Sequence, residues 1–108
     1  MKNIFTLCAL AVSALASATA YADEAAQMAR GKQLFNTATP ACAVCHTLKD
    51  AGSEGAIGPA LDELRPDAAR VARAMRDGIG SMPSFKGSLN EADINAVALY
   101  VSKASGAK

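Results

Sequence analysis

The sequence predicts an all-α domain of three to four helices. Apolar residues recur at helical spacing in several stretches, and no stretch has the alternating apolar and polar pattern, bounded by turn residues, that is typical of a strand. Glycine and proline gather instead in two irregular segments, 50–59 and 78–87, which separate the helices. The chain has 108 residues and is long enough for one domain at most.

The first 22 residues predict a secretory signal peptide, so that residues 23–108 form the domain. A short positive start precedes an uncharged, mostly apolar run at 4–18, and Ala20 and Ala22 fit an A-x-A cleavage site. The alternative is a retained membrane anchor, but the run is shorter than the ~20 residues that span a bilayer. Cys8 lies in this run and is expected to be removed. We therefore expect export to the periplasm.

Cleavage leaves 86 residues with two cysteines, and loss of Lys2 leaves ten basic residues against ten acidic ones. Near-neutral charge, with no basic stripe interleaved with aromatics, predicts no binding to nucleic acid. Only Phe35, Phe85 and Tyr100 remain as aromatic residues, so the side chains alone form a modest core. A large apolar cofactor would supply part of what is missing.

The first two helices are expected on either side of Pro40, which cannot continue a helix. Residues 24–36 carry an apolar stripe that includes Gly31 and Phe35. A second, short helix is expected over residues 42–49.

The last two helices are expected around the second irregular segment. One runs over residues 67–77 and ends at Gly78. The other begins after Asn90, which is a good N-cap, and continues to about Lys103.

The pattern C-A-V-C-H at residues 42–46 predicts covalent attachment of haem c. Two thiols at this spacing can add to neighbouring vinyl groups of haem, and His46 then supplies the fifth iron ligand. A structural zinc site needs four protein ligands, and a catalytic one needs three plus water. The mature chain offers two cysteines and one histidine, and it has no second Cys/His cluster. A thioredoxin-like pair would need a βαβ pattern, which is absent from the sequence.

The sixth iron ligand is expected to be Met82. His46 is the only histidine, so a second histidine ligand is excluded. Met28 and Met75 lie on apolar helical stripes and fit a core role. Met82 lies in a glycine-rich loop beside Pro83, where no amphipathic pattern calls for an apolar residue. A His/Met pair raises the reduction potential and closes both axial positions of the iron.

These features resemble the class I cytochromes c over essentially the whole mature chain. The shared order is Gly31 and Phe35, then C-A-V-C-H, Gly58-Pro59-Ala60-Leu61, Met82-Pro83, and a last helix with Tyr100. The resemblance implies that the first and last helices cross closely at Gly31. It also implies that Pro59 and Leu61 contact the haem site, with the Pro59 carbonyl accepting a hydrogen bond from His46.

The segment between Phe35 and Cys42 is longer than in mitochondrial cytochromes c, and it suggests a bacterial branch. Residues 41–52 are similar to those of small cytochromes that accept electrons from periplasmic sulfite dehydrogenases.

We therefore expect a periplasmic, monomeric electron carrier and not an enzyme, passing electrons from a dehydrogenase to an acceptor such as a terminal oxidase. Alternatives are a haem subunit of a larger membrane or dehydrogenase complex, and a haem enzyme or gas sensor with a displaceable sixth ligand. Partners would dock transiently at the haem edge. Steering residues are expected among Lys49, Arg70, Arg73, Arg76 and Lys86, although Arg73 is also placed to pair with Asp77. Arg65 is a candidate ligand for the haem propionates.

Overall fold

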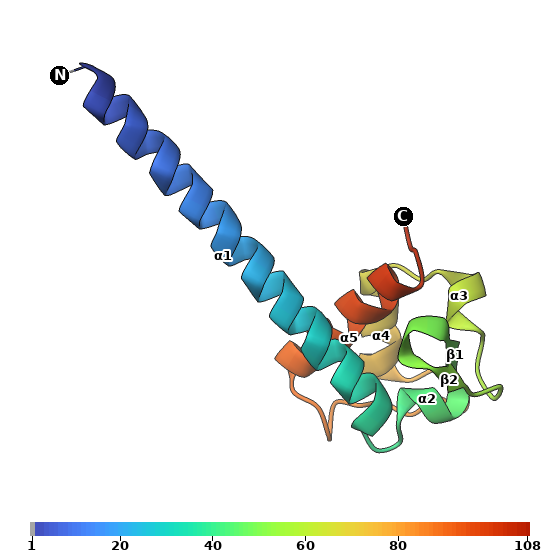
Figure 1. The fold of residues 1–108 in the computed structure, drawn as a ribbon. Coiled ribbons are helices and arrows are strands. Elements are labelled where there is room, and N and C mark those ends of the chain that lie inside the picture. The colour runs from blue at the N-terminus through green and yellow to red at the C-terminus, as the bar shows by residue number, and fades with distance from the viewer. Residues whose placement is uncertain (1) are drawn as a thin grey trace.

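The computed structural model describes the backbone of residues 2–108 and the side chains of residues 18–108. Cys8 lies outside the described side chains. Most of the described chain is helical, as predicted, and the helices surround one core (Figure 1). In chain order the elements are α1 (Lys2–Thr37), α2 (Cys42–Cys45), β1 (Thr47–Leu48), η1 (Lys49–Ala51), β2 (Ser53–Glu54), α3 (Leu61–Leu64), α4 (Ala68–Asp77) and α5 (Glu91–Ala104).

The helix α1 begins earlier than the predicted first helix. It runs without a break from Lys2, and its first part projects away from the other elements (Figure 1). Cleavage after Ala22 would leave the part of α1 that packs on the domain. Within the described residues, no helix is long and apolar enough to cross a membrane.

The crossing of α1 and α5 confirms the predicted role of Gly31. A Cβ atom at this position would lie 2.2 Å from the Ala96 carbonyl oxygen and 2.6 Å from the Tyr100 Cβ. One turn further along α1, Phe35 meets Tyr100 edge-to-face, with ring centroids 6.0 Å apart. Both aromatic side chains are buried. The glycine therefore lets the two helices approach, and the aromatic pair fills the space beside it.

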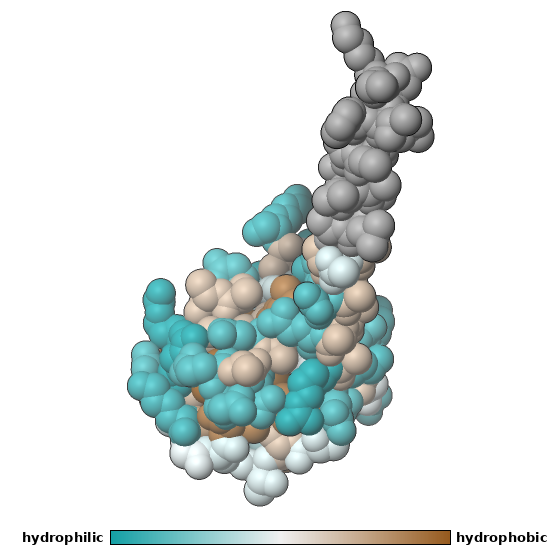
Figure 2. Space-filling view, turned by 90° about the vertical axis from the view of Figure 1, so that its left-hand side faces the viewer, coloured by the Kyte–Doolittle hydropathy of each residue, from teal (hydrophilic) through white to brown (hydrophobic). Residues whose placement is uncertain are grey.

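The helix α4 packs on the other side of α5 and completes the core. The predicted Asn90 cap is confirmed, since its side chain accepts a hydrogen bond from the Asp93 N–H. Asp67, expected as the first residue of α4, instead caps it by accepting a hydrogen bond from the Arg70 N–H. Met75 is 1% exposed and belongs to the core, as its helical position predicts. Hydrophilic side chains cover much of the outer surface, with hydrophobic ones recessed between them (Figure 2).

Residues 46–54 correct two predictions from the sequence. The helix expected over 42–49 ends at Cys45, because His46 is extended, with φ −118° and ψ 136°. The expectation of no strands is also wrong, since β1 and β2 form a short antiparallel pair. The Ser53 hydroxyl stabilises this turn, accepting from the Leu48 N–H and donating to the His46 carbonyl, both at 2.9 Å. The short helix α3 was not predicted either.

A carboxylate in η1 links the turn after the cysteine motif to both crossing helices. The Tyr100 hydroxyl donates a hydrogen bond of 2.6 Å to Asp50, and the Lys32 ammonium lies 3.5 Å from the same oxygen. The hydrogen bond from Tyr100, followed by the charge of Lys32, lowers the pKa of Asp50. Burial, and then the bond to Asp50, raises the pKa of Tyr100.

This link predicts a pH-dependent contribution to stability. Because the folded-state pKa of Asp50 is lowered, its contribution is present above the unfolded-state pKa and is lost as pH falls through the folded-state pKa. We expect Asp50→Asn to cost about 1 kcal/mol at pH 7, because the carboxylate is half exposed, and progressively less in acid. Denaturant unfolding of the haem-bound wild type and Asp50→Asn, from pH 7 down through the folded-state pKa of Asp50, measures the difference in unfolding free energy. Glu63→Gln, which removes an exposed carboxylate elsewhere, is the control. A cost independent of pH would contradict the assignment.

Candidate functional site

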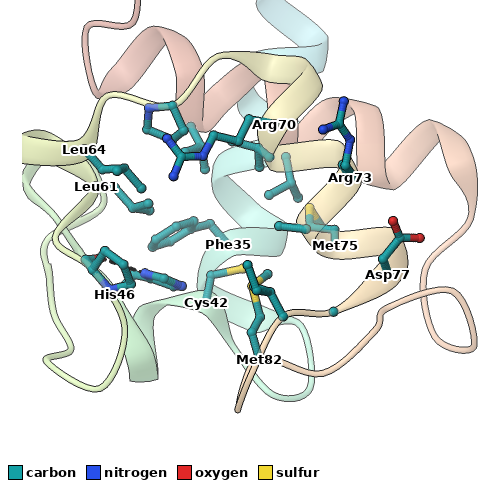
Figure 3. A pocket seen from close by; sticks show the side chains of 18 residues that line it. Phe35, Cys42, His46, Leu61, Leu64, Arg70, Arg73, Met75, Asp77 and Met82 are labelled. Atoms are coloured by element: carbon teal, nitrogen blue, oxygen red, sulfur yellow. Dashed lines mark hydrogen bonds between the residues drawn. The ribbon is translucent and has the colours of Figure 1, made fainter.

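Two adjoining cavities, of about 370 and 240 Å³, lie between α2, the Gly58–Pro59 turn, α4 and the loop after α4. Cys42, His46, Pro59 and Met82 line both cavities. Figure 3 shows Cys42, His46 and Met82 around the larger cavity. The remaining walls of the larger cavity are mostly apolar. Together the cavities have the size and character of a site for a large apolar ligand with a few polar anchors.

The helix α2 holds both cysteines of the motif at the cavity wall. It consists of one turn, so Cys42 and Cys45 lie on neighbouring positions of the same face. Both thiols are free and half-buried, and Cys45 lines the smaller cavity. Burial raises the pKa of the Cys42 thiol to about 11, so in the haem-free chain it is uncharged at neutral pH. Both thiols therefore face the cavities from one helical turn.

The imidazole of His46 is held by the turn that follows the hairpin. Its Nδ1 lies 2.8 Å from the Pro59 carbonyl oxygen, which can only accept, so Nδ1 carries the proton and donates. This is the contact that the family resemblance implies. It leaves the lone pair of Nε2 free for a metal ion and fixes the plane of the ring.

Gly58 has a closer role than the sequence pattern indicates. A Cβ atom there would lie 2.5 Å from Cε1 of His46 and 2.8 Å from its Nδ1. Its N–H also donates to the Cys45 carbonyl at 2.7 Å. Only glycine therefore lets this segment of the backbone pass across the imidazole ring of His46. The glycine–proline pair after the motif was the available signal, but it reads equally well as an ordinary turn.

The loop after α4 brings Met82 to the cavities. Ile79 and Met82 exchange two backbone hydrogen bonds, of 3.0 and 2.9 Å, which close the loop into a tight turn. Met82 is half-buried, whereas Met75 lines the larger cavity from within the core. Met28 packs against the core and lines neither cavity. Met82 is thus the methionine that shares both cavities with His46.

The other predicted residues divide into two groups. Leu61 is buried and lines the larger cavity, as expected for a haem contact. Arg65 lines neither cavity, and its Nε donates instead to the Asp62 carbonyl at 3.4 Å. Within the described residues, no group of three or more His, Cys, Asp or Glu side chains could hold a metal ion.

A thiol pair on one turn, a histidine with a free Nε2, a facing thioether and apolar walls fit an iron porphyrin attached through two thioethers. The fold and the site thus define a c-type cytochrome.

Comparisons with known proteins agree with this class. The family model described as cytochrome c oxidase, cbb3-type, subunit III matches residues 26–101. Cytochrome c6 of Picosynechococcus sp. is 34% identical over 113 residues, which cover 88% of this chain and 90% of that protein. The crystal structure of the c-type cytochrome SorU from Sinorhizobium meliloti is 49% identical, with a TM-score of 0.71, and the match covers 75% of this chain and 93% of that one.

The chain belongs to this cytochrome c family and is a monohaem class I c-type cytochrome. Its cofactor is one covalently bound haem c with its iron, and it is a small electron carrier. The predicted family, all-α cytochrome c fold and cofactor are thereby confirmed.

Proposed function

We propose that the chain carries single electrons in the periplasm from a dehydrogenase, with sulfite dehydrogenase as the favoured donor, to an acceptor such as a terminal oxidase. Cys42 and Cys45 form the two thioethers, and His46 and Met82 bind the iron. Haem c supplies a one-electron Fe(III)/Fe(II) couple: the donor loses an electron to it, and the acceptor takes the same electron away. The observation that carries the ligand assignment is the His46–Pro59 hydrogen bond of 2.8 Å, which frees Nε2 at a cavity shared with Met82.

The chain's own residues hold the iron environment fixed in both oxidation states. Pro59 orients the imidazole and keeps its proton on Nδ1. The paired backbone bonds between Ile79 and Met82 limit movement of the thioether. If His46 and Met82 both hold the iron, neither side chain would need to move when an electron is exchanged, and no iron position would be open to oxygen or peroxide. This supports a carrier rather than an enzyme or a gas sensor.

Partner docking is proposed at the mouth of the smaller cavity. Ile57 and Ile79 line this cavity and are 73% and 70% exposed. Among the described residues, no Asp, Glu, Lys or Arg side chain lines it. An apolar, uncharged surface suits the small and transient contacts of electron-transfer partners. It also predicts that charge steering by Lys49, Lys86 and the arginines is weak.

Stopped-flow reduction by a sulfite dehydrogenase tests the proposal. We expect fast second-order reduction that changes little with ionic strength, a several-fold slower rate for Ile57→Ser, and an unchanged rate for Ala56→Ser. Ala56 is the exposed neighbour that lines neither cavity. A steep dependence on salt, or equal rates for the two variants, would contradict docking at this surface.

Location and assembly are tested on the same purified material. The proposal expects an N-terminus at Asp23 in periplasmic extracts and elution as a monomer in size-exclusion chromatography. A retained N-terminal segment would favour a membrane-bound form, and stable co-elution with the dehydrogenase would favour a subunit of a complex.

A further inference from the structure

The larger cavity is charged along only one of its walls. Arg70, Arg73 and Asp77 line it from α4. Phe35 from α1, Leu61 and Leu64 from α3, and Val97 and Val101 from α5 form apolar walls. These three α4 residues are the only Asp, Glu, Lys or Arg side chains that line this cavity among the described residues.

Neither arginine has an anionic partner within the described chain. The ion pair predicted between Arg73 and Asp77 is not formed, and neither guanidinium takes part in a side-chain hydrogen bond. By contrast, Arg76 on the same helix binds Glu91 at 2.8 Å. The Asp67 cap holds the backbone at Arg70, with an N–H to carboxylate distance of 2.8 Å. The Arg70 guanidinium is exposed beside an apolar wall and has no counter-ion within the described chain, so it is free to bind an anionic ligand.

The position of Arg70 matches the anionic edge of the cofactor. Haem carries two propionates on the edge opposite its vinyl groups, so thioethers at Cys42 and Cys45 direct the carboxylates away from α2. Figure 3 shows Arg70 reaching over the cavity on the side opposite Cys42, whereas Arg73 stands at the outer edge with its guanidinium turned away.

We propose that Arg70 binds a haem propionate through its guanidinium, and that Arg65, the candidate from sequence, does not. The inference rests on the proposed attachment at Cys42 and Cys45. A guanidinium is well suited to this role because it is always charged and presents a planar set of donors to a carboxylate. The propionate then stays ionised through the physiological range, and its negative charge near the iron is compensated.

Redox titration of the haem-bound protein as a function of pH tests this assignment. Arg70→Gln removes the compensating charge, so we expect a lower midpoint potential at pH 8 than in the wild type. The propionate should also bind a proton within pH 5–8, which gives a potential that rises as pH falls. Arg70→Lys should restore the potential in part. The matched controls are Arg65→Gln, just after α3, and Arg76→Gln, in α4. Each removes one cation that lines neither cavity and should leave the pH profile unchanged.

Three outcomes would overturn the assignment: a wild-type profile for Arg70→Gln, the same change in Arg65→Gln, or an equal or larger change in Arg73→Gln. Failure of the haem attachment is recognised separately. Haem staining after denaturing electrophoresis and the ferric absorption spectrum should be normal in every variant, and an abnormal result in the wild type would count against the proposed attachment and against this inference with it.

Discussion

Replacing Gly31 with alanine is expected to lower the unfolding free energy of the haem-bound protein by about 1–2 kcal/mol. The new methyl group would lie 2.2 Å from a backbone oxygen of α5, at Ala96. Backbone atoms cannot turn aside as a flexible side chain can, so the two helices must separate. Overpacking of this kind costs roughly 1–3 kcal/mol and occasionally more. The better helix propensity of alanine, worth about 1 kcal/mol, offsets only part of it.

Denaturant unfolding followed by circular dichroism measures this loss. Gly87→Ala is the matched control, because a Cβ atom there meets nothing within 4 Å. It should change the unfolding free energy by no more than about 0.5 kcal/mol. If Gly31→Ala were as stable as the wild type, the close crossing of α1 and α5 would be wrong.

The second large effect is expected when Cys42 and Cys45 are both replaced by serine. Without the two thiols no thioether can form, so haem should be lost on denaturing electrophoresis. The chain should also lose much of its thermal stability, because two adjoining cavities of about 370 and 240 Å³ would lack the ligand that fills them. A domain of this size has little other apolar core to compensate.

Haem staining and thermal melts of the single and double variants measure this effect. Cys45→Ser alone retains Cys42 and should keep covalently bound haem, which controls for the serine substitution itself. A double variant that still stains for haem after denaturation would show that attachment occurs elsewhere in the chain.

The parts of the fold that local chemistry determines could be predicted from the sequence. The Asn90 cap is an example, because its side-chain oxygen accepts a hydrogen bond from the N–H three residues later, a spacing that is visible in the sequence. A glycine within the apolar stripe of a helix indicated a close approach at Gly31. The hairpin of β1 and β2 could not be predicted, because each strand has two residues and a single hydroxyl, that of Ser53, stabilises the turn.

The site likewise has features that could be predicted from the local sequence and features that could not. The cysteine motif and His46 are contiguous, so haem attachment could be predicted from the sequence directly. Met82 was chosen by elimination among three methionines, and its role as iron ligand stays a prediction. The contact of Gly58 with the His46 ring and the place of Arg70 over the cavity depend on how distant segments pack. Arg65 was the candidate propionate ligand from the sequence, whereas we propose Arg70, because nothing local distinguishes one arginine from another.

Absorption of the ferric protein at long wavelength tests the central claim, a closed His46/Met82 iron, most directly. A weak band in this region marks methionine bound to ferric haem. We predict that the wild type has the band, that Met82→Ala loses it, and that Met28→Leu, which changes a methionine lining neither cavity, keeps it. A band that survives in Met82→Ala would contradict the account.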